Sequence, residues 1–255
     1  MTRPASPRIT IFPDPQTMAS AVASQIAERL AANPRLVLGL PTGRTPIPMY
    51  ERLARLAAED RADFSRATTF NLDEFLGLAP DHPGSFRTFM DTHLFGPVNL
   101  CADRIHFLDG VAPRPDEECA RYEQSIVKAG GIDLQVLGVG TNGHIGFNEP
   151  APELQPWTHR VMLTMETRGA NAELFGGDPS AVPTEALTMG MATILHARSI
   201  VLLASGSSKA SVVERILYGP ITTELPASFL QLHQDVEIVL DEPAAAGVIV
   251  ARGRV

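Results

Sequence analysis

Short apolar runs alternate along the chain with longer segments in which hydrophobic residues recur at helical spacing. Met18, Val22, Ile26 and Leu30 show the second pattern, which predicts a helix over 16–32. Further helices are predicted at 47–58, 85–95, 116–129 and 209–217, and strands at 8–12, 36–40, 67–72, 105–108, 132–139, 161–165, 186–189, 200–204, 229–232 and 236–240. Such alternation is typical of α/β proteins and predicts a mostly parallel sheet with helices on both faces.

No repeat or low-complexity linker divides the chain, so its 255 residues are expected to form a single domain, 1–255. The stretch 150–186 carries several prolines and glycines and is predicted to form a lid. The net charge of −8 argues against binding to nucleic acid or to an anionic membrane, but allows an anionic substrate in a locally basic site. Cys101 and Cys119 form no disulfide framework, and no leader or membrane-spanning run is visible. A cytoplasmic protein with reduced thiols is therefore expected.

Four polar clusters follow predicted strands directly, at 42–45, 71–74, 141–149 and 205–209. In sheets of this kind, binding sites form at the carboxyl ends of the strands. The four clusters are therefore expected to converge on one site.

Residues 138–143 match the pattern G-x-G-x-x-G after a strand, which brings a dinucleotide site into consideration. That motif requires a helix immediately afterwards. Pro150, Pro152 and Pro156 leave no room for such a helix, because a proline in a helix interior costs about 3 kcal/mol. The glycines are therefore interpreted as a tight loop that directs His144 and Glu149 into a cleft.

His144 lies between the amide of Asn142 and the carboxylate of Glu149. A single histidine is more often structural than catalytic. An imidazole that titrates near neutrality can nevertheless take a proton from one oxygen and deliver it to another, as the opening of a pyranose ring requires. Glu149 would hold the second ring nitrogen and favour the charged form.

Asp73 follows a strand and has Asn71 and Glu74 beside it. An isolated aspartate in this position is typically a helix cap. Next to the expected His144 loop, a general base that removes a proton beside a carbonyl carbon is the more attractive interpretation.

Two clusters are candidates for binding a phosphate. Thr42, Gly43, Arg44 and Thr45 lie between a strand and a helix, where backbone N–H groups and a guanidinium favour an anion, although a plain turn would use the same residue types. Lys209 ends a Ser-Gly-Ser-Ser-Lys segment that is not a Walker A loop and offers a second contact. The histidines are scattered without ligand spacing, so no metal site is expected.

Four segments together resemble the glucosamine-6-phosphate deaminase family: 38–43 (LGLPTG), 70–74 (FNLDE), 138–150 (GVGTNGHIGFNEP) and 186–190 (ALTMG). Their order and spacing agree with the family along nearly the whole chain. The sister family of 6-phosphogluconolactonases shares the fold and the Gly-His pair but lacks the Asn-Glu-Pro that follows.

The resemblance implies a Rossmann-like α/β fold and the conversion of glucosamine 6-phosphate and water into fructose 6-phosphate and ammonia. It implies that Asp73 moves the proton from C2 to C1 through an enolamine-type intermediate. It also implies that His144 opens the ring with support from Glu149 and Asn142, and that Lys209 binds the phosphate. No cofactor or catalytic metal is expected, and the partner is a small-molecule sugar phosphate.

The chain departs from the family in its charged residues. Many members have Asp where this chain has Asn142, so Asn142 can only orient His144, and Glu149 must supply the charge. Many members have a phosphate-binding Arg on the lid where this chain has Glu173, whereas Arg44 occupies a position that is often Gly or Ser. These two differences suggest that Arg44 replaces the lid Arg, or that the substrate differs somewhat, as galactosamine 6-phosphate does.

Other functions and assemblies stay open at this point. A lactonase is the main alternative enzyme. A sugar-phosphate sensor is the alternative without catalysis, since the fold also serves as the ligand-binding half of some transcription regulators. The sequence speaks against a sensor, because it contains no helix-turn-helix and retains Asp73, His144 and Glu149. The family includes monomers and hexamers, so a homo-oligomer is also left open.

Regulated family members bind N-acetylglucosamine 6-phosphate through basic and Ser residues that follow the Glu-Pro. This chain has Pro152, Glu153, His159 and Val161 in that region, so we expect no activation by this compound. Initial-rate kinetics should be hyperbolic and unchanged by the compound. Sigmoidal kinetics that the compound relieves would contradict this expectation.

Overall fold

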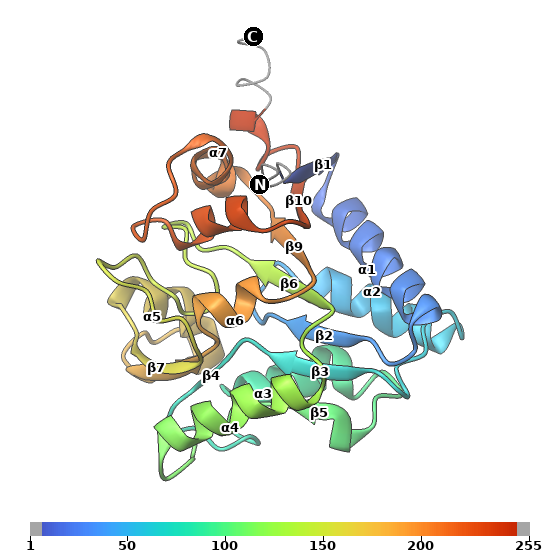
Figure 1. The fold of residues 1–255 in the computed structure, drawn as a ribbon, viewed down its shortest axis with the longest axis horizontal. Coiled ribbons are helices and arrows are strands. Elements are labelled where there is room, and N and C mark those ends of the chain that lie inside the picture. The colour runs from blue at the N-terminus through green and yellow to red at the C-terminus, as the bar shows by residue number, and fades with distance from the viewer. Residues whose placement is uncertain (1–6, 249–255) are drawn as a thin grey trace.

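The computed structural model describes residues 7–248 and contains a seven-stranded sheet in the order β1-β10-β9-β6-β2-β3-β5 (Figure 1). Every pairing in this sheet is parallel, which confirms the predicted α/β architecture. Its strands are β1 (Arg8–Phe12), β2 (Val37–Leu40), β3 (Thr68–Asn71), β5 (Ile105–His106), β6 (Leu134–Gly138), β9 (Ser199–Ala204) and β10 (Val236–Asp241). No helix between residues 7 and 248 has the length and apolar character needed to cross a membrane.

Both faces of the sheet are covered, so its central strands are apolar on both sides. In β9, Ile200 and Leu202 pack into one core and Val201 and Leu203 into the other. Helices α1 (Pro15–Ala32) and α2 (Ile47–Ala58) cover one face of the sheet, together with the π-helical segment η1 (Asp91–Phe95). Helices α4 (Pro115–Lys128), α6 (Met191–Leu195) and α7 (Ala210–Tyr218) cover the other.

A second, three-stranded sheet lies beside the first, in the antiparallel order β4-β8-β7. Its strands are β4 (Asp73–Phe75), β7 (His159–Met162) and β8 (Glu185–Thr188). Phe75, Phe86 and Phe147 pack together at its centre, so β4, the start of α3 (Phe86–Met90) and the loop after β6 share one small core. The segment predicted as a lid supplies β7, α5 (Met165–Asn171) and the 3-10 helix η3 (Ala172–Phe175) to this unit.

Several sequence predictions need correction. The apolar run 229–232 is not a strand but part of the 3-10 helix η5 (Pro226–Leu232), in which buried residues recur about every third position rather than every second. The strand predicted at 161–165 lies at β7, and Met165 instead begins α5, because the Thr164 side chain accepts a hydrogen bond from Thr167 N and caps that helix. Helix 85–95 is split into α3 and the π-helical segment η1, and short 3-10 helices, η2 (Ala102–Arg104) and η4 (Ser207–Lys209), precede β5 and α7.

The order of the strands defines where a site can form. From β2 the chain proceeds to β3 and β5 on one side, and from β6 it proceeds to β9 and β10 on the other. The loops after the neighbouring strands β2 and β6 therefore diverge, and doubly wound sheets bind their ligands at the carboxyl edge of such a point.

Gly190 packs closely against the backbone of Pro156 and Trp157. A Cβ atom at this position would lie 2.2 Å from the carbonyl oxygen of Trp157. Since backbone cannot yield as a flexible side chain does, we expect Gly190→Ala to lower the free energy of unfolding by about 1–3 kcal/mol, measured by urea denaturation. Gly169→Ala is the matched control: it lies in α5 with nothing within 4 Å and should stabilise slightly. Equal stability of both variants would contradict the tight contact.

Candidate active site

The chain passes from the parallel sheet to the antiparallel sheet between Asn71 and Asp73. Asn71 ends β3, where its side-chain amide donates to the carbonyl of Leu40 and its own carbonyl accepts from the Tyr122 hydroxyl. Asp73 begins β4 and pairs with Thr188 of β8. Asp73 therefore lies in a strand where the two sheets meet, rather than in a loop after a strand as the sequence suggested.

Glu74 is buried and held by four hydrogen bonds. Its carboxylate accepts from the Ser85 hydroxyl at 2.7 Å, from Phe86 N at 3.1 Å, from Arg87 N at 3.0 Å and from Phe75 N at 2.8 Å. Three of these donors belong to the first turn of α3, whose N-terminus favours a negative charge. The helix-cap role considered for Asp73 thus falls to Ser85, the N-cap of α3, with Glu74 as a further acceptor for the same turn.

Asp73 differs from its neighbour in having no such partners. Its side chain is buried, and within residues 7–248 no group donates a hydrogen bond to its carboxylate. Burial, and secondarily the nearby charge of Glu74, raise the pKa of Asp73 to about 8. Burial also raises the pKa of Glu74, but its four hydrogen bonds oppose that rise, whereas Asp73 has no such donor.

The loop after β6 is held by hydrogen bonds to the end of β8, the strand that pairs with β4. Phe147 N donates to the Thr188 hydroxyl at 3.0 Å, and the Asn148 side chain donates to the carbonyls of Ile145 and Met189. Gly146 adopts φ +57°, and a Cβ atom there would lie 3.7 Å from Asp73 Oδ2. The loop backbone therefore passes directly beside the Asp73 carboxylate.

His144 and Glu149 face one another within this loop. Gly140 lets the imidazole lie flat against the backbone, since a Cβ atom there would come within 2.3 Å of the ring. His144 Nδ1 is 3.4 Å from Glu149 Oε2, so the two form a charge contact when the imidazole is protonated. Asn142 does not reach the ring: its Nδ2 donates to Glu149 Oε2 at 2.7 Å, and its Oδ1 accepts from His144 N at 3.1 Å.

Glu149 has one further partner that the sequence did not suggest. The hydroxyl of Thr167, on α5, donates to Glu149 Oε1. Burial alone would raise the pKa of Glu149, but the nearby imidazole of His144 and the hydrogen bonds from Thr167 and Asn142 hold it well below its ordinary value. Glu149 is therefore a stable negative charge behind His144.

Lys209 lies at the carboxyl edge of β9 and is half-buried, and desolvation lowers its pKa. Within the described part of the chain, no carboxylate pairs with its ammonium group. The preceding Ser205 and Gly206 are tied instead to Asp241, which accepts from the Ser205 hydroxyl at 2.6 Å and from Gly206 N at 3.0 Å. A half-buried cation without a counter-ion is suited to a bound anion.

The loop of Thr42, Gly43, Arg44 and Thr45 follows β2 at the same edge. Gly43 has φ +101°, which favours glycine. Arg44 is exposed and its guanidinium lies 3.4 Å from the carboxylate of Glu173 on the lid. The two positions that differ from the family in sequence thus form an ion pair with each other.

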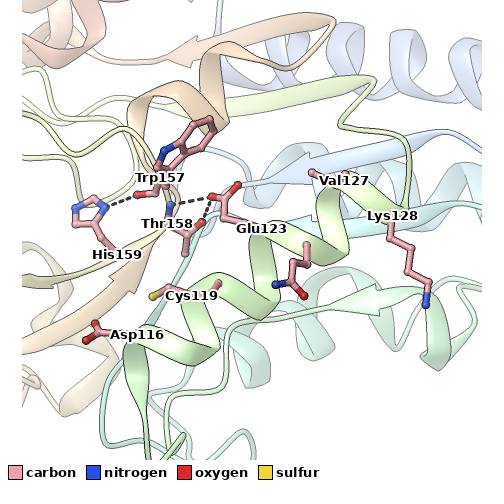
Figure 2. A pocket seen from close by; sticks show the side chains of 10 residues that line it. Asp116, Cys119, Glu123, Val127, Lys128, Trp157, Thr158 and His159 are labelled. Carbon is pink, nitrogen blue, oxygen red and sulfur yellow. Dashed lines mark hydrogen bonds between the residues drawn. The ribbon is translucent and has the colours of Figure 1, made fainter.

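A cavity of about 660 Å³ lies elsewhere, between α4 and the start of β7 (Figure 2). It is lined by one face of α4 and by Trp157, Thr158 and His159, and it includes none of the predicted site residues. Glu123 accepts hydrogen bonds from the backbone N and hydroxyl of Thr158 and from the hydroxyl of Thr193, which fixes this wall. Among residues 7–248, no three His, Cys, Asp or Glu side chains are grouped as ligands for a metal ion.

Comparison with known proteins places this geometry in a family. The family model described as glucosamine-6-phosphate isomerases/6-phosphogluconolactonase matches residues 13–239. The chain belongs to this family. A family member from Rhodopirellula baltica, named glucosamine-6-phosphate deaminase, is 50% identical over 238 residues, 93% of this chain and 94% of that protein. Glucosamine-6-phosphate deaminase 2 of Giardia intestinalis is 49% identical over 227 residues, 89% and 86% of the two chains.

Solved structures of the family agree with the fold described above. A monomeric glucosamine-6-phosphate deaminase has a TM-score of 0.91 at 40% identity, covering 94% of this chain and 99% of that one. The 6-phosphogluconolactonase from Trypanosoma cruzi has a TM-score of 0.75 at 23% identity, covering 97% and 99%, a similarity that concerns the fold alone. The family resemblance inferred from the motifs is confirmed.

The ion pair between Arg44 and Glu173 leads to a prediction for substrate binding. If Arg44 holds the phosphate, Arg44→Ala should raise KM by about tenfold or more with little change in kcat, since a charge-assisted hydrogen bond contributes about 1.5–3 kcal/mol. Glu173→Gln removes a competing carboxylate and should lower KM, by about twofold. Steady-state kinetics measure both.

Arg66→Ala is the matched control, because Arg66 is exposed and precedes β3 at the opposite edge of the sheet. It makes the same change in net charge without touching the site. A KM for Arg44→Ala equal to that of Arg66→Ala would mean that Arg44 does not bind the phosphate.

Proposed function

We propose that the protein converts glucosamine 6-phosphate and water into fructose 6-phosphate and ammonia. The observation that carries the proposal is the position of Gly146: it brings the loop of His144 and Glu149 directly beside the Asp73 carboxylate. A ring-opening acid/base and a base for the carbon next to the carbonyl are thus available to one bound sugar. The relatives named glucosamine-6-phosphate deaminase support the same chemistry.

His144 is assigned to ring opening. Its imidazole accepts the proton of the C1 hydroxyl and delivers a proton to the ring oxygen, which breaks the C1–O5 bond and leaves an open-chain aldehyde. The imidazolium formed on the way is stabilised by the Glu149 carboxylate 3.4 Å from Nδ1. Asn142 keeps that carboxylate in place through its 2.7 Å hydrogen bond.

Asp73 is assigned to the isomerisation. Its carboxylate removes the proton from C2 while the proton released by the C2 ammonium group is taken up by O1, which gives a neutral enolamine, and the resulting carboxylic acid returns its proton to C1. This leaves an imine at C2, which water hydrolyses to the ketone of fructose 6-phosphate with release of ammonia. A base whose pKa is raised to about 8 by burial suits this double role, because it binds the transferred proton firmly and still releases it.

The phosphate is assigned to the edge formed by the loops after β2 and β9. Lys209 supplies a half-buried ammonium group without a carboxylate partner among the described residues. Thr42, Gly43 and Thr45 form the turn before α2, and Arg44 supplies a guanidinium that can exchange Glu173 for the phosphate. The two loops lie on either side of the His144 loop, because β6 lies between β2 and β9 in the sheet.

Other predictions bear on the setting of this reaction. The substrate epimer is assigned from the relatives' names, and galactosamine 6-phosphate stays the second candidate of the same class. A cytoplasmic location stays a prediction, as does the oligomeric state; the structural neighbour at 40% identity is a monomeric enzyme.

The assignment is tested by ammonia release and by the loss of the base. The purified protein should release ammonia from glucosamine 6-phosphate and form fructose 6-phosphate in equal amount, with no hydrolysis of 6-phosphogluconolactone. Asp73→Asn should lose at least about 10³-fold in kcat, because the amide cannot accept the C2 proton. Asp81→Asn, an exposed position, is the control. Full turnover by Asp73→Asn would mean that another group is the base, whereas a wild type that binds the sugar phosphate without releasing ammonia would favour a sensor.

The same variant tests the burial of the carboxyl group through stability. In the folded state the pKa of Asp73 is raised from 3.8 to about 8, so the folded protein retains a proton that the unfolded chain has lost over this range. Stability contributed by this group therefore falls as the pH rises from about 4 to about 8. Asp73→Asn should be more stable than the wild type at pH 8 to 9 in thermal unfolding, and by less at pH 5. A lower Tm of the variant at both pH values would contradict this.

A further inference from the structure

The lid makes three polar contacts with the catalytic loop and the phosphate edge, and one of them is buried. The Thr141 hydroxyl lies 3.3 Å from Glu166, and Arg44 lies 3.4 Å from Glu173, both in solvent-exposed contacts. Exposed polar pairs contribute little to stability. The third contact, from the Thr167 hydroxyl to Glu149 Oε1, is made by a residue that is 2% exposed. This hydrogen bond is therefore the buried polar link between lid and site, beside the apolar packing of Phe147 against the lid residues Leu163 and Ala172.

The direction of this hydrogen bond is set by the lid helix itself. Thr164 caps α5 and donates its hydroxyl hydrogen to Thr167 Oγ1 at 3.2 Å, while accepting from Thr167 N at 3.1 Å. Thr167 has a single hydroxyl hydrogen, which is left for Glu149. The first turn of α5 thus presents an oriented donor to the carboxylate.

Glu149 transmits this orientation to His144. A carboxylate is planar and rigid, so fixing Oε1 also fixes Oε2. Oε2 is the atom that accepts from Asn142 at 2.7 Å and faces His144 Nδ1 at 3.4 Å. Without Thr167, only Asn142 would hold the carboxylate, and the carboxylate could rotate about its last side-chain bond away from the imidazole.

We propose that Thr167 is a positioning residue: its hydroxyl, carried by the lid helix α5, orients the Glu149 carboxylate toward His144, so that ring opening is efficient only while the lid is seated. The inference rests on the proposed function, since it assigns Thr167 to the ring-opening step of that reaction. Thr167 contacts Glu149 and not the sugar in this assignment, so its loss affects turnover rather than binding.

The test replaces the hydroxyl by a methyl group of nearly the same size. Thr167→Val should lower kcat for glucosamine 6-phosphate by about 10- to 100-fold, the value of one hydrogen bond to a charged group, and leave KM within about twofold. The inhibition constant of 2-amino-2-deoxyglucitol 6-phosphate, a reduced analogue that has no ring to open, should also stay within about twofold. Thr167→Ser, which restores the donor, should recover most of kcat.

Asn171→Ala is the matched control, because its side chain donates to the carbonyl of Thr167 at 2.8 Å and supports α5 without touching Glu149. A kcat loss of equal size in this variant, an unchanged kcat in Thr167→Val, or a failure of Thr167→Ser to recover activity would overturn the proposal. If Thr167→Val does not fold, Thr167→Ala and Thr167→Ser form the same comparison. A wild type that releases no ammonia overturns the proposed function and this inference together, whereas an active wild type with unaffected variants overturns the inference alone.

Discussion

Two neighbouring carboxyl groups are buried where the chain leaves the parallel sheet and joins the antiparallel one, and the site depends on how differently they are held. Glu74 has four hydrogen-bond donors, three of them in the first turn of α3, so its charge is compensated by structure. Asp73 has no donor among the described residues, and burial raises its pKa to about 8. An uncompensated carboxyl group in a dry setting costs stability when it ionises, and a carboxyl group held in this way fits the proposed role of Asp73 as a base.

The two sheets and their loops bring His144 and Glu149 into the region of the Asp73 carboxyl group. The strand order separates the loops after β2 and β6, and the small core around Phe147 fixes the second of these loops against β4 and β8. His144 then lies in the same region as Asp73, with Glu149 behind it. The lid belongs to the same packing unit, because α5 presents Thr167 to Glu149. The residues proposed for phosphate binding, ring opening and proton transfer thus belong to separate elements that meet at one edge.

The sequence was sufficient for elements with strong periodicity and for clusters at strand ends. Helix α2 was predicted with its observed bounds, and the loop of His144 and Glu149 was expected near Asp73 because both follow strands of one sheet, although β2 lies between those two strands. β4 was not predicted, because a strand of three residues shows too little periodicity. η5 was predicted as a strand, because a short apolar run does not distinguish a strand from a helix. Thr167 gave no local signal, since its partner lies 18 residues away and depends on how the lid packs. Arg44 and Glu173 were linked in sequence as an exchange of charge between two positions, but only the fold shows that they form an ion pair.

The proposed mechanism depends on the raised pKa of the buried Asp73 carboxyl group, and this pKa can be measured directly. The carboxyl carbon of Asp73 can be followed by ¹³C NMR as a function of pH in protein labelled at aspartate side chains, with Asp73→Asn identifying the resonance. The account predicts a titration midpoint near 8, far above the ordinary 3.8. A midpoint near 4 would show that Asp73 ionises like a surface carboxylate. It would contradict the assignment of Asp73 as a base whose pKa is raised by burial.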